Sequence, residues 1–143
     1  MKANELMVGD WVIDKAVSDK PVQVMQINDR NVHYKHGNGY ISVGIELLDP
    51  VPLTPEILER NGFSKMDMKS PRIDGQHEWV YWQNMSSSVC LWTRELYDDT
   101  KEGWALRIEA GSQSITIVVW HVHELQHALR MCGIDKEMTI KKD

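Results

Sequence analysis

This chain of 143 residues has few cysteines and no long apolar run. Its two cysteines, Cys90 and Cys132, lie far apart and form no C-x-x-C pair, so neither a redox motif nor a disulfide framework is indicated. No apolar stretch approaches the roughly 20 residues of a membrane-spanning helix, and the first residues hold no apolar signal-peptide core. These absences predict a cytoplasmic protein without a membrane partner.

An excess of basic residues is also absent, because 16 Lys/Arg stand against 21 Asp/Glu and give a net charge of −5. The acidity is spread over both halves of the chain, and no basic stripe appears. Without such a stripe, phosphate binding lacks its usual driving force, so nucleic acid is not an expected partner. Nucleic-acid binding through the N-terminal part of the chain is kept as a third hypothesis, which predicts strongly salt-dependent association.

Tryptophan is abundant: the chain has six, with a single phenylalanine. Exposed tryptophans are common anchors of protein interfaces, whereas buried ones are large core residues whose indole N–H needs a partner. We predict a partner-binding surface that includes at least two members of one set, namely Trp11, Trp79, Trp82, Trp92 and Trp104.

Short strands and tight turns fill residues 1–53. Strands are expected over residues 11–13, 21–27, 32–34 and 40–43. Residues 21–27 alternate strictly between apolar and polar, which is typical of a strand with one buried face. Asn and Asp at 28–31 and Gly at 37 and 39 favour tight turns between these strands. The pattern predicts an SH3-like barrel or strongly bent sheet, with a simple meander as the alternative.

Residues 49–53 contain two prolines and form a stiff connector, so we divide the chain into modules 1–53 and 54–143. Thr54 as N-cap and Pro55 at the first helical position open a short helix that Gly62 ends. Residues 64–76 are polar and are expected to form a loop.

The rest of the second module reads as an antiparallel meander. Strands are expected over residues 78–83, 89–94, 104–109 and 114–120, and the β-branched run 115–120 is predicted to be the central strand. A helix over residues 122–132 follows, ended by Gly133, and residues 137–141 are expected to add an edge strand. The predicted fold class is α+β: an N-terminal SH3-like strand cluster, a short helix, then an antiparallel sheet covered by a C-terminal helix.

The C-terminal helix spells an explicit chemical motif, His123-Glu124-Leu125-Gln126-His127. H-E-x-x-H on a helix places two zinc ligands one turn apart beside a glutamate that acts as general base. It gives the alternative hypothesis of a zinc-dependent hydrolase with His123 and His127 as ligands and Glu124 as the base. A third ligand is missing at the usual place, since the residues after His127 include no histidine; Asp135 is the nearest downstream candidate, and His77, Glu78 and His121 are upstream ones.

The helical phase favours a structural reading of this motif. At about 100° per residue, one apolar stripe contains Val122, Leu125, Leu129 and Cys132. His123 and His127 lie on the opposite face, which points toward solvent or a second module. We therefore predict a solvated amphipathic helix, with no metal and no other cofactor.

Three segments carry a family resemblance: KANEL (residues 2–6) with GDWV (9–12), PLTPEILERNGF (52–63) and VHELQHAL (122–129). They resemble an uncharacterised family of small bacterial proteins often encoded in prophages and mobile elements. The resemblance implies no known activity or cofactor, and the family pattern V-H-x-L-Q leaves the positions of Glu124 and His127 free to vary. We therefore expect a non-enzymatic accessory or interaction protein, of phage or mobile-element origin, that binds a protein partner through an aromatic surface.

Overall fold

The computed structural model describes residues 1–2, 5–66, 80–84, 89–93, 104–110, 113–131, 133–134 and 137–140. The chain forms two compact units. The first consists of Met1–Pro52, His121–Ala128 and Ile140–Asp143, and the second of Leu53–Trp120 and Leu129–Thr139. Each unit is therefore assembled from segments that are distant in the sequence.

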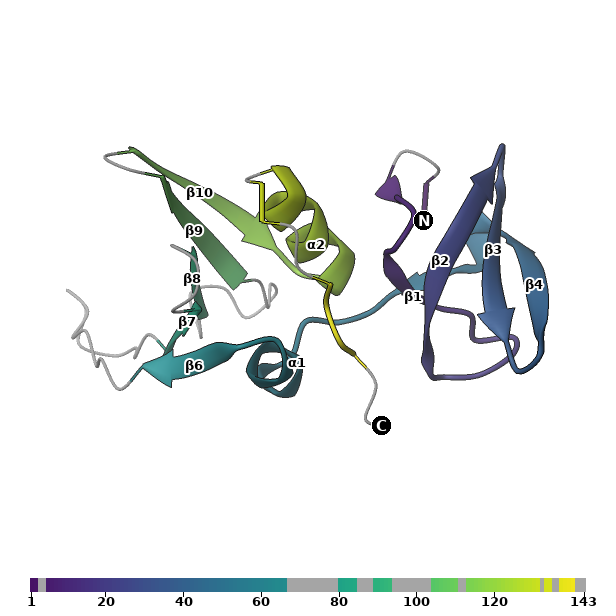
Figure 1. The fold of residues 1–143 in the computed structure, drawn as a ribbon, viewed down its shortest axis with the longest axis horizontal. Coiled ribbons are helices and arrows are strands. Elements are labelled where there is room, and N and C mark those ends of the chain that lie inside the picture. Colours follow the sequence, from purple (N-terminus) through teal and green to yellow (C-terminus); the bar gives the residue numbers. More distant parts are fainter. Residues whose placement is uncertain are drawn as a thin grey trace. The chain divides into compact units, whose positions relative to one another are not determined.

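The first unit contains a five-stranded antiparallel sheet with the order β4-β3-β2-β1-β5 (Figure 1). Its elements are β1 (Trp11–Ile13), β2 (Pro21–Asn28), β3 (Asn31–His36), β4 (Gly39–Gly44), the 3₁₀ turn η2 (Ile45–Leu47) and β5 (Asp49–Pro50). After the 3₁₀ turn the last strand returns to pair with the first. This return confirms the SH3-like cluster and excludes a simple meander, in which β5 would pair with β4.

Local sequence explains most of this unit. Val22 and Val24 point inward from β2, and a register shift between Val24 and Gln26 interrupts the alternation. Asp29 and Gly37 occupy positive φ angles, as their turns require. The core of the unit consists of Leu6, Val12, Val22, Val24, Val32, Tyr34, Ile45 and Leu48.

The second unit opens with the short helix α1 (Pro55–Arg60), as predicted. The Oγ1 atom of Thr54 accepts a hydrogen bond of 3.4 Å from the backbone N–H of Ile57. Gly62 follows the helix with a φ of 84°, a value that glycine adopts without steric cost. The predicted cap and stop of this helix are both confirmed.

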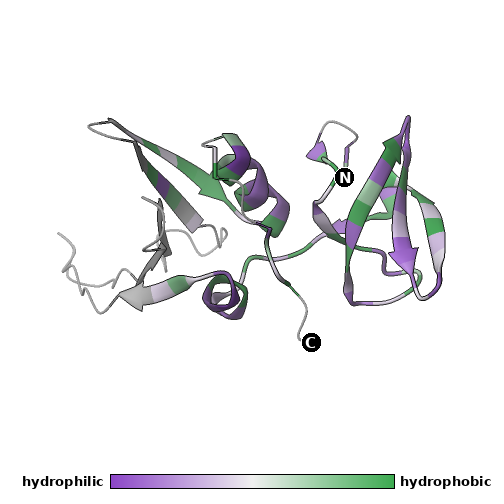
Figure 2. Cartoon of the chain, in the orientation of Figure 1, coloured by the Kyte–Doolittle hydropathy of each residue, from purple (hydrophilic) through white to green (hydrophobic). Residues whose placement is uncertain are grey.

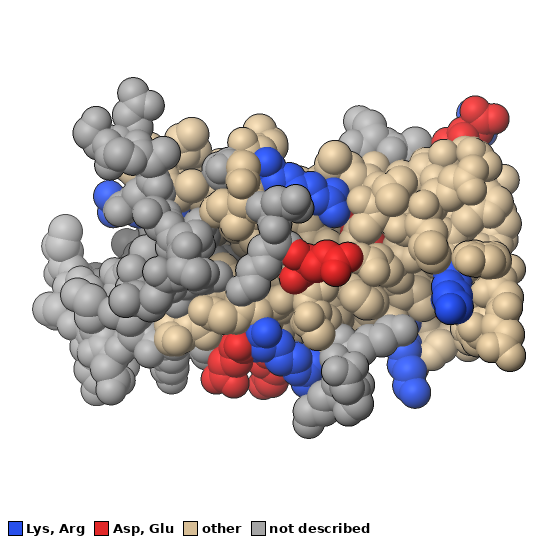
Figure 3. Space-filling model, viewed as in Figure 1, with Lys and Arg blue, Asp and Glu red and all other residues tan. Residues whose placement is uncertain are grey.

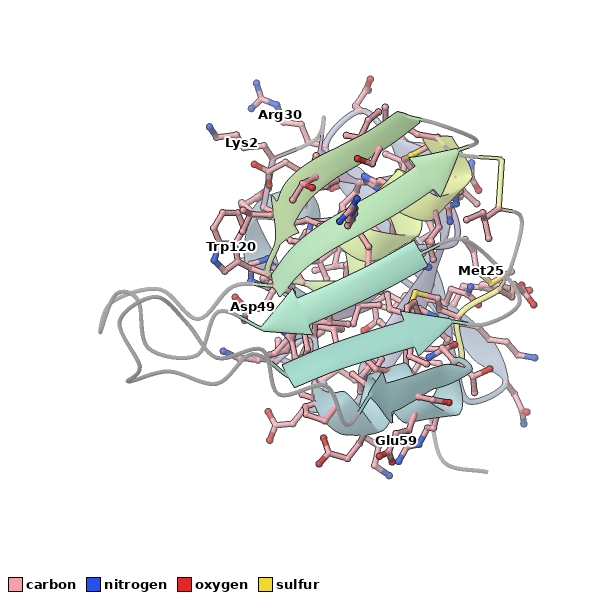
Figure 4. The ribbon with its side chains drawn as sticks, turned by 90° about the vertical axis from the view of Figure 1, so that its left-hand side faces the viewer. Lys2, Met25, Arg30, Asp49, Glu59 and Trp120 are labelled. Atoms are coloured by element: carbon pink, nitrogen blue, oxygen red, sulfur yellow. The ribbon has the colours of Figure 1, made fainter. Side chains whose placement is uncertain are left out.

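A second five-stranded antiparallel sheet follows, with the order β10-β9-β8-β7-β6. Its strands are β6 (Phe63–Met66), β7 (Val80–Asn84), β8 (Val89–Thr93), β9 (Trp104–Ala110) and β10 (Gln113–Val119). Figure 4 looks onto this sheet. The two sheets and the helices give the predicted α+β class.

Three sequence predictions for this unit are wrong. Residues 64–66 belong to strand β6 and not to a loop. Strand β10 lies at the edge of the sheet and not at its centre, because β-branched composition does not determine how many neighbours a strand has. Residues 137–140 form no strand; instead the backbone of Thr139 makes hydrogen bonds with the side chain of Asn61.

The C-terminal helix α2 (Val122–Met131) follows β10. The predicted apolar stripe is buried at Val122, Leu125 and Leu129, while Cys132 lies outside the described residues. Gly133 takes a φ of 74° and its N–H donates to the Arg130 carbonyl at 3.0 Å, as a glycine stop does. Neither helix in the described part of the chain has the length and hydropathy needed to span a bilayer.

Candidate functional site

The first two turns of α2 contact the turn before β1, within the first unit. The Nε2 atom of His127 lies 2.6 Å from Oδ2 of Asp10, close enough for a hydrogen bond to the carboxylate. Gln126 donates from its amide to the Gly9 carbonyl at 3.0 Å and accepts the Trp11 N–H at 3.1 Å. The end of the motif is therefore bonded to a segment more than a hundred residues away in the sequence.

Asp10 is held by its own turn as well as by His127. Its Oδ2 accepts the Met7 N–H at 2.7 Å, and its carbonyl accepts the Val24 N–H at 2.8 Å. Gly9 supports this turn with a φ of 95°. Asp10 is fully buried, and a buried carboxylate needs such partners. This role could not be predicted from the sequence, in which Asp10 looks like an ordinary turn residue beside Gly9.

The start of α2 is capped by the glutamate of the motif. Glu124 Oε1 accepts the backbone N–H of His121 at 3.1 Å and lies 2.7 Å from His121 Nδ1. Glutamate at the third helical position commonly bonds back to the N-cap residue in this way. The geometry therefore gives Glu124 a helix-capping role, in place of the general base of the zinc alternative.

His123 lies on α2 near both the Glu124 cap and the His127 contact. It is buried, with an exposed fraction of 6%. Its ring centroid is 5.7 Å from that of His121, with nearly parallel planes, and 5.7 Å from that of His127, with an edge-on orientation. Among the described residues, nothing forms a hydrogen bond with His123 Nδ1. Burial lowers the pKa of His123, while the negative charges of Glu124 and Asp10 oppose that shift.

Of the two surroundings predicted for the face of His123 and His127, solvent is wrong and a second module is correct. His123 is buried and the His127 side chain is only 24% exposed, because this face contacts the N-terminal module and not water. Within the part of the chain that the structure describes, no group of three or more His, Cys, Asp or Glu side chains is placed to hold a metal ion. The candidate ligands His77, Glu78 and Asp135 lie outside the described residues, and the zinc alternative stays a hypothesis.

The structure does not bring the predicted tryptophans together on a described surface. Trp11 is half-buried, and Trp104 is buried with its indole N–H donating to the Leu53 carbonyl at 3.2 Å. Trp82 and Trp92 belong to β7 and β8, but their side chains and the whole of Trp79 lie outside what is described. A partner-binding surface formed by Trp79, Trp82 and Trp92 therefore stays a prediction.

A different apolar surface lies along β10 and the residue after it. Four of its side chains are exposed: Ile115 at 62%, Ile117 at 39%, Val118 at 48% and Trp120 at 41%. Figure 2 shows the green, hydrophobic colour over much of β10. We call these four residues the β10 edge. No charged residue occurs from position 113 to 120, a signal that was visible in the sequence but was interpreted as burial.

The β10 edge presents apolar groups on both faces of its strand. Ile115 and Ile117 are paired with Ile108 and Leu106 of β9 and so point to the same face as these buried side chains. Val118 points to the opposite face. Exposure on the first face rises from Val119, which is buried, toward Ile115.

The charged side chains form no comparable feature on the face shown in Figure 3. There, the Lys and Arg side chains of the described residues are scattered between acidic ones and wide uncharged areas. The histidine face of α2 and the β10 edge are therefore the two features with functional potential in the described residues. Compared with known proteins, the chain matches no protein-family model, no curated protein and no solved structure.

Proposed function

We propose that this protein is a non-enzymatic interaction protein that binds an extended apolar segment of a partner protein along the β10 edge. The observation that carries the proposal is the exposure of Ile115, Ile117, Val118 and Trp120 on an uncharged edge strand. The resemblance of its KANEL, PLTPEILERNGF and VHELQHAL segments to small prophage-encoded proteins fits an accessory role of phage or mobile-element origin.

Edge strands normally carry features that prevent pairing with other chains, such as charges, prolines, bulges or short length. Strand β10 has seven residues, and none of them is charged or proline. Its register with β9 runs without a shift along its whole length. These properties favour the addition of a further strand at its outer side.

Strand addition would use two kinds of contact. Backbone N–H and C=O groups on the outer side of an edge strand supply hydrogen bonds to an incoming segment, while alternate side chains supply specificity. Ile115 and Ile117 would contact the segment on one face and Val118 on the other. Trp120, which is labelled in Figure 4 and is exposed, would supply the aromatic anchor, at a position outside the predicted set.

Substitution Ile115→Lys tests this proposal. The residue is exposed, so the change should leave the free energy of unfolding within about 0.5 kcal/mol of its original value. Random short peptides displayed on phage are selected on the purified protein, and the selected sequences are synthesised for fluorescence anisotropy. We expect apolar, β-branched peptides whose affinity falls about tenfold or more with Ile115→Lys, since that loss corresponds to about 1.4 kcal/mol of lost contact.

Met131→Lys is the matched control, because Met131 is an exposed apolar residue of α2 outside the β10 edge. The control should bind the selected peptides as tightly as the original protein. N-methylation of alternate peptide groups should abolish binding, since it removes backbone donors. The proposal fails if no peptide is selected, or if the selected peptides bind Ile115→Lys unchanged.

The zinc alternative has its own test. Elemental analysis of protein purified without an affinity tag should show no stoichiometric zinc, because His127 and Glu124 are engaged by Asp10 and His121. Bound zinc that is lost in His123→Ala would instead support a hydrolase.

A further inference from the structure

His123 is a buried base with a ring nitrogen that lacks a hydrogen-bond partner among the described residues. Buried polar atoms in this state are uncommon and cost free energy. A phenylalanine at the same place would carry no such cost. The position therefore favours a role for the imidazole that a purely apolar side chain could not have.

We propose that protonation of His123 breaks the contact between α2 and residues 9–11. When the His123 imidazole is neutral, it stays buried beside His121 and His127. Gln126 and His127 then keep their bonds to residues 9–11. When the imidazole is protonated, the segment His121–Ala128 separates from the turn so that the new charge reaches water. This proposal does not depend on the β10 edge.

The ionisable groups that act on His123 come from the N-terminal segment, the turn before β1 and α2, and they are Glu5, Asp10, His121, Glu124 and His127. The two carboxylates whose charge favours protonated His123 already contact other groups, since Asp10 contacts His127 and Glu124 contacts His121. Two imidazoles lie 5.7 Å away and oppose a further positive charge. Burial has the largest effect, and the pKa of His123 is lowered.

The sign of the pH dependence follows from this direction. A histidine whose pKa is lowered in the closed state is neutral there and takes up a proton on release. The contact is therefore fully stable above the ordinary histidine pKa of about 6.5. It weakens as pH falls from that value toward the lowered pKa of the closed state, by up to about tenfold per pH unit for one proton.

Hydrogen exchange of the full-length protein tests the release. The Trp11 N–H bonds to the Gln126 side chain, so its protection factor reports the contact. The Ile45 N–H bonds to the Arg30 carbonyl inside the SH3-like cluster and reports the cluster itself. We expect protection at Trp11 to fall by up to about tenfold per pH unit below about pH 6.5, with protection at Ile45 unchanged.

Variants assign the effect to His123. His123→Phe keeps a ring without a titrating group, and His123→Gln is a second, polar replacement; both should flatten the pH profile at Trp11. His36→Gln, at an exposed position of β3, should keep the original profile, and a chelator should not change it. Where both His123 variants fold poorly, the ring resonances of His123 in the original protein must titrate with the same midpoint as Trp11 protection.

Three outcomes would overturn the proposal. The first is a parallel loss of protection at Ile45, which would mean that the whole cluster unfolds. The second is a profile that persists in both His123 variants but disappears in His127→Gln, which would assign the effect to the Asp10 pair. The third is a profile that changes with the chelator.

Discussion

At the level of single residues, Tyr34 and Asp14 show how two buried polar side chains of the first unit pair with each other. The Tyr34 hydroxyl donates to Asp14 Oδ2 at 2.7 Å, and both residues are almost fully buried. Burial raises the pKa of Tyr34 to about 12, and the hydrogen bond to Asp14 adds to that shift. The pair fixes β3 to the segment after β1.

Tyr34→Phe should lower the free energy of unfolding by about 1–3 kcal/mol at neutral pH, because Asp14 loses a partner while it stays buried. Urea denaturation measures this loss. A tyrosine whose pKa is raised in the folded state loses its contribution as pH rises above its ordinary value of about 10. The difference between the two proteins should therefore narrow between about pH 10 and 12.

Tyr40→Phe is the control, since Tyr40 is an exposed tyrosine of β4, and it should match the original protein at every pH. A constant difference between Tyr34→Phe and the original protein across the alkaline range would contradict the assignment.

Residue-level prediction from the sequence worked where a role depends on near neighbours. The Thr54 cap and the glycine stops at Gly62 and Gly133 follow from local backbone chemistry. The bond between His127 and Asp10 could not be predicted, because it joins residues 117 positions apart. Helical phase placed His127 on the face opposite the apolar stripe, but it could not decide between solvent and a second module as the neighbour of that face.

Helix α1 is attached at its end to the segment of residues 137–140 by one side chain. Asn61 Nδ2 donates to the carbonyls of Ile57 at 2.7 Å and Thr139 at 2.9 Å, and its Oδ1 accepts the Thr139 N–H at 2.7 Å. The side chain thus replaces the strand neighbour that was predicted for this segment.

Asn61→Ala should cost about 1–3 kcal/mol of unfolding free energy, since the N–H and C=O of Thr139 both lose their partly buried side-chain partner. Urea denaturation gives the total, and hydrogen exchange at Thr139 gives the local effect. Asn38→Ala, in an exposed turn, should change neither. Undiminished protection of the Thr139 N–H in Asn61→Ala would show that other contacts hold this segment.

Elements were predictable from the sequence to the extent that they are local. Alternation and turn residues located β2 and the hairpin of β3 and β4, and capping residues located α1. The neighbours of each strand depend on the path of the whole chain, so the position of β10 at an edge was missed. The apolar residues of β10 suggested a central strand, because the same composition suits a buried strand and an edge strand that binds a partner.

At the scale of the whole molecule, neither unit is a continuous stretch of sequence. The first 52 residues share their unit with part of α2, and Gln126 supplies two of the bonds that hold this part. A proline-rich connector is a sound signal for a boundary in the chain. It cannot show that a later segment returns to the first unit.

Gln126→Ala should therefore act mainly on the first unit, with a loss of about 1–3 kcal/mol. Hydrogen exchange should show reduced protection in β1 and β2, while β9 and β10 keep theirs. Gln26→Ala removes an exposed glutamine of β2 and should have no such effect. Equal losses in both sheets would show that the two units unfold as one cooperative body.

The contacts of Gln126 and His127 join residues 115 to 117 positions apart. A ribosome synthesises the turn at Asp10 long before it synthesises these partners. The emerging chain must therefore carry an SH3-like cluster that lacks its last segment until α2 has been synthesised. Long-range contacts of this kind form late and slowly, so an open turn at Asp10 would mark an unfinished chain, and its closure would mark one whose synthesis has passed α2.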